Sequence, residues 1–190
     1  PYFKDGDLKK ATQLFDEALQ EMGKSKEDFS NIVLCCPKDA MHESVAQVVQ
    51  RQWNQAFGVD IRIVTTDWKI LHEKLTCGDF QIGSMVWGPA IKDPIYMLKT
   101  FKYRSDSINK TRWEHPRYRE LLDASDEELD PVKRRQIFVE AETLLMEELP
   151  IIPISFMTID YAKNPHLHNL CISEFGDIDF KWAYFDDEKR

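Results

Sequence analysis

Apolar residues recur along the first half of the chain at helical and strand spacings, and the two periods alternate. Helical stripes, each bounded by a glycine or an aspartate, and short apolar runs follow one another in the order β-α-β-α-β after a first helix. The predicted elements are a helix over Asp7–Met22, a strand over Asn31–Cys36, a helix from Val45 to Ala56, a strand over Val59–Thr65, a helix capped by Asp67, and a strand over Phe80–Trp87. This alternation predicts an α/β fold with core strands joined by crossover helices.

The second half of the chain has a different pattern. A polar stretch with scattered aromatics over Phe101–Glu114 indicates a loop. Two helices then follow, over Pro116–Ser125 and from Asp130–Pro131 to Pro150, because Asp-Pro favours a helix start. Beyond them, Ile151–Tyr161 is rich in β-forming residues, and Phe180–Phe185 alternates like a strand after an acidic connector.

The stretch Asp79–Pro94 is the best candidate for a binding site. Its predicted strand ends at Trp87, and Gly88 and Pro89 break the pattern before a helix opens at Asp93–Pro94. In an open α/β sheet, ligands bind outside the carboxyl ends of the strands. Trp68, in the first turn of a helix, can face the same rim as Trp87. The two indoles could instead be core residues, but together they favour an amphipathic wall of a ligand pocket.

Composition limits the class of protein. The 190 residues are enough for one domain, or one domain with a tail, and 43% are hydrophobic. The net charge of −8 disfavours nucleic acid and anionic membranes as partners, and no apolar run approaches a membrane span. The start at Pro1 is expected to reflect processing or excision from a longer chain.

The cysteines and histidines do not form a recognisable metal or redox motif. We expect buried thiols at all four cysteines, and one disulfide is an alternative that the sequence leaves undecided. Because Cys35 and Cys36 are adjacent, their side chains should point to opposite faces of a strand. His166 and His168 are better explained as solvated loop residues than as metal ligands. No GxSxG, HExxH, GxGxxG or P-loop occurs, so the sequence favours a binder over an enzyme, with no catalytic residue, metal site or cofactor predicted.

Three segments, taken in order, resemble the carboxy-terminal lobe of the oligopeptide- and dipeptide-binding proteins of bacterial ABC importers, solute-binding protein family 5. They are QRQWNQAFGVDIRIVTTDWKIL, GDFQIGSMVWGPAIKDPIYML and AETLLMEELPIIPISF, and the closing DFKWAYF resembles the family's last strand. The likeness extends over nearly the whole chain, from the helix DLKKATQLFDEAL onward. Each segment alone is a weak match, whereas their order and spacing together are specific.

The resemblance implies a periplasmic-binding-protein-like lobe (type II, cluster C), with a mixed sheet flanked by helices. Family members have two lobes that close on a peptide, and this chain resembles only the second large lobe. Residues 1–175 would form the ligand-binding lobe. Residues 176–190 would be a crossover strand and tail returning to an amino-terminal lobe that the sequence lacks. The apolar face of Phe180–Phe185 would then be exposed, or would pack against this lobe instead.

The resemblance also implies site residues. The family's pocket histidine falls on His42 and its two pocket tryptophans fall on Trp68 and Trp87. The strand end that pairs with the peptide backbone falls on Val86 and Gly88, a form of β-augmentation.

Three positions depart from the family pattern. Ser84 replaces an arginine that can meet a carboxylate, and Ala90 replaces an aspartate that anchors the peptide's amino terminus. Gly88 replaces a half-cystine. An N-blocked, differently charged or non-peptide ligand therefore becomes plausible.

We expect a lobe that captures a peptide and delivers it to an ABC permease in the membrane, in the periplasm or on the outer face of a bacterial cytoplasmic membrane, with a lipid anchor as one option. One alternative is the same fold binding a metal chelate, haem or a sugar. Another is the ligand-sensing domain of a transcription regulator, which an amino-terminal DNA-binding segment would reveal. A hydrolase would need an activity that no motif suggests.

Overall fold

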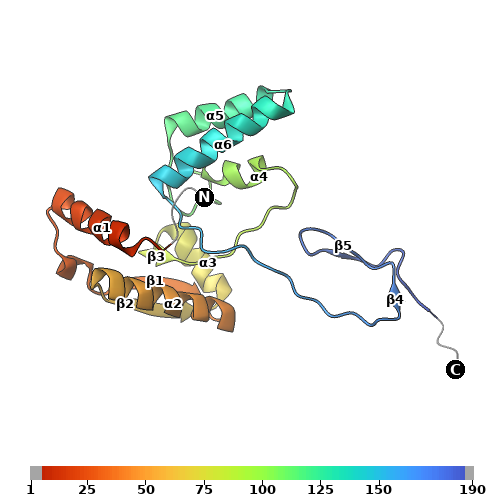
Figure 1. The fold of residues 1–190 in the computed structure, drawn as a ribbon, viewed down its shortest axis with the longest axis horizontal. Helices are drawn as coiled ribbons and strands as arrows, with labels where there is room; N and C mark the ends of the chain where they lie inside the picture. The colour runs from red at the N-terminus through yellow and green to blue at the C-terminus, as the bar shows by residue number, and fades with distance from the viewer. Residues whose placement is uncertain (1–5, 187–190) are drawn as a thin grey trace.

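The computed structural model describes residues 6–186 of the chain. Its centre is a three-stranded parallel sheet in the order β2-β1-β3, formed by β1 (Ile32–Pro37), β2 (Ile61–Thr66) and β3 (Ile82–Gly83). Helices α1 (Leu8–Met22), α2 (Ala40–Phe57) and α3 (Trp68–Cys77) precede or connect these strands (Figure 1). The predicted α/β class is confirmed, but the central sheet is parallel rather than mixed, because the antiparallel pairs of residues 6–186 lie outside it.

The sheet is covered on both faces because side chains alternate along β1. Leu34 and Cys36 pack with Ala46 of α2 and with Phe15 of α1. Cys35 packs with Leu71 and Leu75 of α3 on the other face. The predicted separation of Cys35 and Cys36 onto opposite faces is therefore confirmed.

Local caps explain where the helices begin and end. Asp7 accepts a hydrogen bond from the N–H of Lys10 at the start of α1, and Gly23 ends that helix in the left-handed conformation. Asp39 caps α2 through the N–H groups of Met41 and His42. The predicted cap at Asp67 has the right position, but its side chain makes no capping hydrogen bond within residues 6–186.

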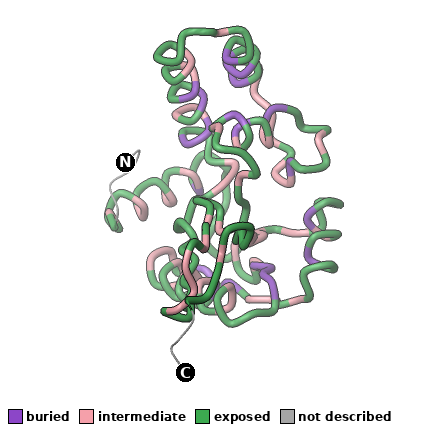
Figure 2. Tube along the Cα trace, turned by 90° about the vertical axis from the view of Figure 1, so that its right-hand side faces the viewer, coloured by how far each residue is buried: buried purple, intermediate pink, exposed green. Residues whose placement is uncertain are grey.

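A second group of helices follows the sheet in the chain and forms a cluster of its own (Figure 1). It consists of α4 (Ile95–Leu98), the 3₁₀ turn η2 (Lys99–Phe101), α5 (Pro116–Glu127) and α6 (Pro131–Glu148). These helices share their own core around Tyr118, Leu122 and Ala141, all of which are fully buried. Figure 2 shows buried residues along the helices at the top of the view. A further 3₁₀ turn, η1 (Lys26–Phe29), lies between α1 and β1.

The third core strand is shorter than predicted. The sequence indicated Phe80–Trp87, whereas β3 contains only Ile82 and Gly83, followed by one more bond from the N–H of Ser84 to the carbonyl oxygen of Cys35. In a parallel ladder, the next bond would need an N–H at Pro37, and proline has none. The hydrogen-bonded pairing therefore stops at Ser84.

Residues 149–186 form an extended arm rather than a packed layer (Figure 1). The strand-rich prediction for Ile151–Tyr161 is wrong, because this segment has no strand partner within the described chain. The arm contains two antiparallel pairs, β4 (Leu167–His168) with β7 (Tyr184–Phe185) and β5 (Cys171–Ile172) with β6 (Ile178–Asp179). Of the predicted strand Phe180–Phe185, only its last two residues are in a strand.

All four cysteines are free, and the prediction of buried thiols holds for only two of them. Cys35 and Cys36 are buried in the sheet, whereas Cys77 at the end of α3 and Cys171 in β5 are exposed. Within residues 6–186, no helix is long and apolar enough to cross a bilayer.

Candidate functional site

The carboxyl ends of the three core strands lie at one edge of the sheet, because β1 pairs in parallel with both neighbours. The chain leaves β2 into α3 at Trp68, leaves β1 into α2 just before His42, and leaves β3 toward Trp87. The strand order β2-β1-β3 therefore places these three residues after adjacent strands. We refer to Trp68, His42 and the segment 84–90 as the rim.

The two tryptophans of the rim are half-exposed. Trp68 is 49% exposed and Trp87 is 40% exposed, so neither is a core residue in this chain. Trp53 behaves differently and packs against the α2 side of the core, as its helical stripe predicted. The Trp68 ring contacts the ring of His72 one turn later, with centroids 5.9 Å apart. Large flat side chains at an open edge provide apolar area for a guest.

His42 is oriented by an acid of its own helix start. Its Nδ1 lies 2.7 Å from Oδ2 of Asp39. The backbone N–H of His42, followed by its imidazole, holds the pKa of Asp39 below its usual value. With Nδ1 donating to this carboxylate, a neutral ring presents Nε2 as an acceptor. That Nε2 is buried and has no hydrogen-bond partner among the described residues.

The segment after β3 has an unpaired backbone. Residues 85–92 make no backbone–backbone hydrogen bond to any residue between 6 and 186. Val86 is 41% exposed, and Gly88 and Ala90 are exposed as well. A Cβ added at Gly88 would meet nothing within 4 Å. This stretch can therefore accept an extended partner alongside it.

Two hollows on the surface lie elsewhere. One has a volume of 490 Å³ along the outer side of α6, beside Val132 and Val139. The other has a volume of 270 Å³ between α5 and α6, beside Leu121 and Leu144. Neither includes a residue of the rim.

Sequence reasoning missed two contacts at the site. One is the Asp39–His42 pair, which the spacing of an acid three residues before a histidine at a helix start could have suggested. The other is the ion pair between Asp93 and Arg134, 41 residues apart, for which the sequence gives no local signal. Asp93, which directly precedes the first turn of α4, also accepts a hydrogen bond from the N–H of Ile95 at 3.0 Å.

No metal site accompanies the rim. Among residues 6–186, no cluster of three histidine, cysteine or acidic side chains is arranged to hold a metal ion. His166 and His168 instead contact the carboxylate of Asp186, each at 3.1 Å.

Comparison with known proteins connects this geometry to a family. The family model described as "Bacterial extracellular solute-binding proteins, family 5 Middle" matches residues 1–109. The oligopeptide-binding protein OppA of Bacillus subtilis is 36% identical over 97% of this chain, and the dipeptide-binding protein DppE of the same organism is 29% identical over 94%.

A solved structure gives the same result for the fold. The substrate-binding domain of an oligopeptide ABC transporter from Bacillus anthracis superposes with a TM-score of 0.82 at 25% identity, over 95% of this chain. The chain spans about a third of the length of these relatives, namely 34%, 33% and 35%. The chain belongs to the bacterial extracellular solute-binding proteins of family 5.

Proposed function

We propose that this chain is the carboxy-terminal lobe of a longer binding protein that captures oligopeptides outside the cytoplasmic membrane and delivers them to an ABC permease. The names of the relatives support a peptide ligand, and the family description supports an extracellular location. The periplasm, or the outer face of the membrane with a lipid anchor, is the expected compartment.

The observation that carries the proposal is the rim itself. Three parallel strands end at one edge, two half-exposed indoles follow the outer strands, and the backbone of residues 85–88 is unpaired within the described chain. An extended peptide laid along this segment would form main-chain hydrogen bonds, which give affinity for many sequences. Trp68 and Trp87 would contact its side chains, whereas Nε2 of His42 is buried and would support the rim without touching the guest.

The arm supports the proposed second lobe. Phe156 is fully exposed, and the alternating residues Ile152 and Ile154 are more than half exposed. Since apolar rows of this kind are normally covered in soluble proteins, we propose that residues 149–186 pack against an amino-terminal lobe of the complete protein. Residues 176–186 would return into that lobe, which would close over the ligand from the other side of the rim, and residues 187–190 of the predicted tail lie outside the described part of the chain.

The loop that follows β3 carries no acid between Ser84 and Lys92 that could bind a free peptide amine. Ala90 carries a methyl group where the family resemblance places an aspartate. The acid nearest to Ala90 in the sequence, Asp93, is engaged with the guanidinium of Arg134 and the N–H of Ile95. A buried ammonium without a counter-charge is unfavourable. We therefore propose that the complete protein does not use this loop to select a free amino terminus.

The test uses the complete protein. Mass spectrometry of ligand released on denaturation identifies the natural guest, and calorimetry then measures its affinity and that of trialanine. Trp87→Ala should weaken peptide binding by about tenfold or more, because it removes a large contact surface. Leu129→Ala is the matched control, since Leu129 is 94% exposed at the α5–α6 turn, away from the rim.

Two results would contradict the proposal. The first is release of a non-peptide guest together with no measurable binding of peptides. The second is equal affinity in the wild type and the Trp87→Ala variant. A comparison of trialanine with its acetylated form addresses Ala90 separately. The wild type should hardly distinguish the two peptides, whereas Ala90→Asp should favour the free amine.

A further inference from the structure

The loop that presents Val86, Trp87 and Gly88 is held at its two ends. At the upstream end, the N–H of Ser84 bonds to the sheet at 2.8 Å. At the downstream end, Asp93 begins the turn into α4. Between them, residues 85–92 have no backbone–backbone hydrogen bond within the described range. The course of the loop therefore depends on how firmly its ends are fixed.

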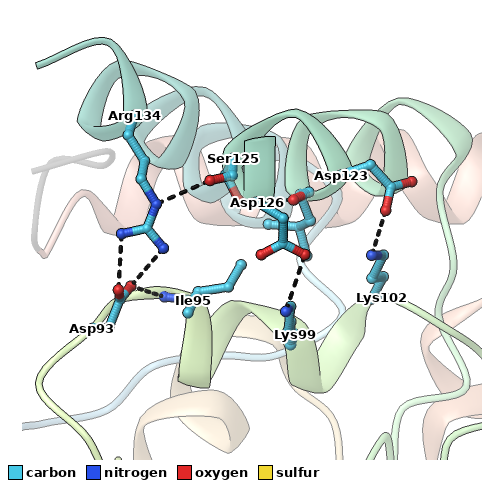
Figure 3. A network of polar contacts seen from close by, with 9 residues as sticks. Asp93, Ile95, Lys99, Lys102, Asp123, Ser125, Asp126 and Arg134 are labelled. Atoms are coloured by element: carbon cyan, nitrogen blue, oxygen red, sulfur yellow. Dashed lines mark hydrogen bonds and ion pairs between the residues drawn. The ribbon is translucent and has the colours of Figure 1, made fainter. Parts of the chain in front are cut away.

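The downstream end is fixed by a two-pronged ion pair (Figure 3). Arg134 of α6 donates from Nη1 to Oδ2 of Asp93 at 2.8 Å and from Nη2 to Oδ1 at 3.3 Å. Oδ1 also accepts from the N–H of Ile95 at 3.0 Å. The Arg134 hydrogen bond is the main reason that the pKa of Asp93 lies below its usual value. Both side chains are about 30% exposed, so solvent screens this pair less than a surface pair.

Arg134 is itself immobilised by the α5–α6 helix pair. Its Nε donates to the carbonyl oxygen of Ser125, a buried residue of α5, at 2.9 Å. Its guanidinium lies 4.6 Å from the ring centroid of Phe138, one turn later on α6. The ion pair therefore connects the binding loop to a packed helical core.

The neighbouring ion pairs do not fix the position of the loop as the Asp93–Arg134 pair does. Lys99 pairs with Asp126 and Lys102 with Asp123, and both pairs join η2 and the residue after it to α5, downstream of Asp93 (Figure 3). Lys92 pairs with Glu174, but these side chains are 75% and 69% exposed, so the pair contributes little.

We propose that Arg134 is a positioning residue for ligand binding: by holding Asp93 against α5 and α6, it fixes the loop that presents Trp87 and the unpaired backbone beside it. This inference rests on the proposed function, because it assigns a role in a peptide-binding rim. Arg134 does not contact the ligand in this account. It acts through Asp93 alone, and its effect on affinity is an effect on where the loop lies.

The experiment uses the complete protein with the variants Arg134→Gln, Arg134→Lys and Asp93→Asn. Asparagine at position 93 can still accept from the N–H of Ile95, so it weakens the ion pair while keeping this hydrogen bond. Lys102→Met is the matched control, because it removes another ion pair to the α5–α6 helix pair, the one with Asp123 of α5, keeps the buried stem and lies beyond the loop. The probe is trialanine, measured by calorimetry.

A second readout reports on the loop without ligand. Tryptophans are labelled with fluorine, and the Trp87 resonance is assigned from the spectrum of Trp87→Phe. Arg134→Gln and Asp93→Asn should shift or broaden this resonance and weaken trialanine binding by about tenfold, and Arg134→Lys should recover part of both. Lys102→Met should lower the melting temperature and leave both readouts unchanged.

The two claims fail in different ways. If wild-type protein binds no peptide, the proposed function fails, and the Trp87 resonance alone then decides whether Arg134 positions the loop. If Arg134→Gln and Lys102→Met lower the melting temperature alike and neither moves the Trp87 resonance or the affinity, Arg134 has only a structural role and the inference is wrong.

Discussion

Residues 6–148 and residues 149–186 both carry rows of apolar side chains, but only the first region buries them. In the first region, α1, α2 and α3 cover the sheet and α4, α5 and α6 pack on one another, so that residues such as Cys36, Leu71 and Tyr118 are 0% exposed. In the second region, no residue is buried, and Phe156 is 100% exposed. The same kind of pattern therefore has two outcomes, depending on whether its partner lies within the chain.

The largest expected difference concerns exchange of backbone amides in the arm. If the arm packs against an amino-terminal lobe, residues 151–161 should exchange hydrogen at least about a thousandfold more slowly in the complete protein than in the 190-residue chain. Hydrogen-exchange mass spectrometry of the two proteins measures this directly. Equal exchange in both would mean that the arm has no partner in the complete protein.

Phe156→Ser tests a single side chain of the arm. In the 190-residue chain, stability should change by less than about 0.5 kcal/mol, because the side chain is already in water. In the complete protein, the same substitution should cost about 3 kcal/mol, since it would empty a packed site. Urea unfolding of each protein gives the comparison. A negligible cost in the complete protein would place Phe156 outside any interface.

Substitution of two glycines of the first region by alanine should affect stability differently. A Cβ at Gly83 would collide with the Cδ2 atom of Leu75, which is buried, so Gly83→Ala should destabilise the fold by about 2 kcal/mol. Gly88 has open space around it, so Gly88→Ala should leave stability unchanged. If a peptide backbone approaches this position, Gly88→Ala should still reduce peptide affinity, as calorimetry would show. Destabilisation by Gly88→Ala would contradict the open rim.

The smallest expected effect is on pH dependence. Because the pKa of Asp93 is lowered in the fold, its stabilising contribution is present above about pH 5 and is lost as the pH falls below about 4. The asparagine side chain of Asp93→Asn has no titratable group. The melting temperature of the complete protein should therefore fall less between pH 5 and pH 3 in this variant. The melting temperature of the variant should fall by a few degrees less than that of the wild type, which corresponds to about 1 kcal/mol of stability. Parallel curves would show that this ion pair contributes nothing to acid sensitivity.

The sequence predicted those elements whose causes are local. Helix α1 begins after Asp7 and ends at Gly23, as a capping acid and a left-handed glycine require. The two core cysteines of β1 alternate between faces because strand geometry leaves no other choice. The placement of Trp68 and Trp87 after strands follows from the same periodicity.

The features that sequence missed have non-local causes. The early end of β3 depends on Pro37 in the neighbouring strand, which only the register reveals. The pairing of Asp93 with Arg134 spans 41 residues and two helices. The Ile151–Tyr161 prediction failed for a third reason. Its residues favour strands, but a strand needs a partner, and none is present within the described chain.

The central claim is that an extended peptide pairs with the backbone that follows β3. Hydrogen-exchange mass spectrometry of the complete protein, with and without saturating trialanine, tests it most directly. The account predicts slower exchange of the amides of residues 85–88 when the peptide is bound, with unchanged exchange in the middle of α6. Protection that appears elsewhere in the protein, while residues 85–88 exchange at the same rate with and without peptide, would contradict it.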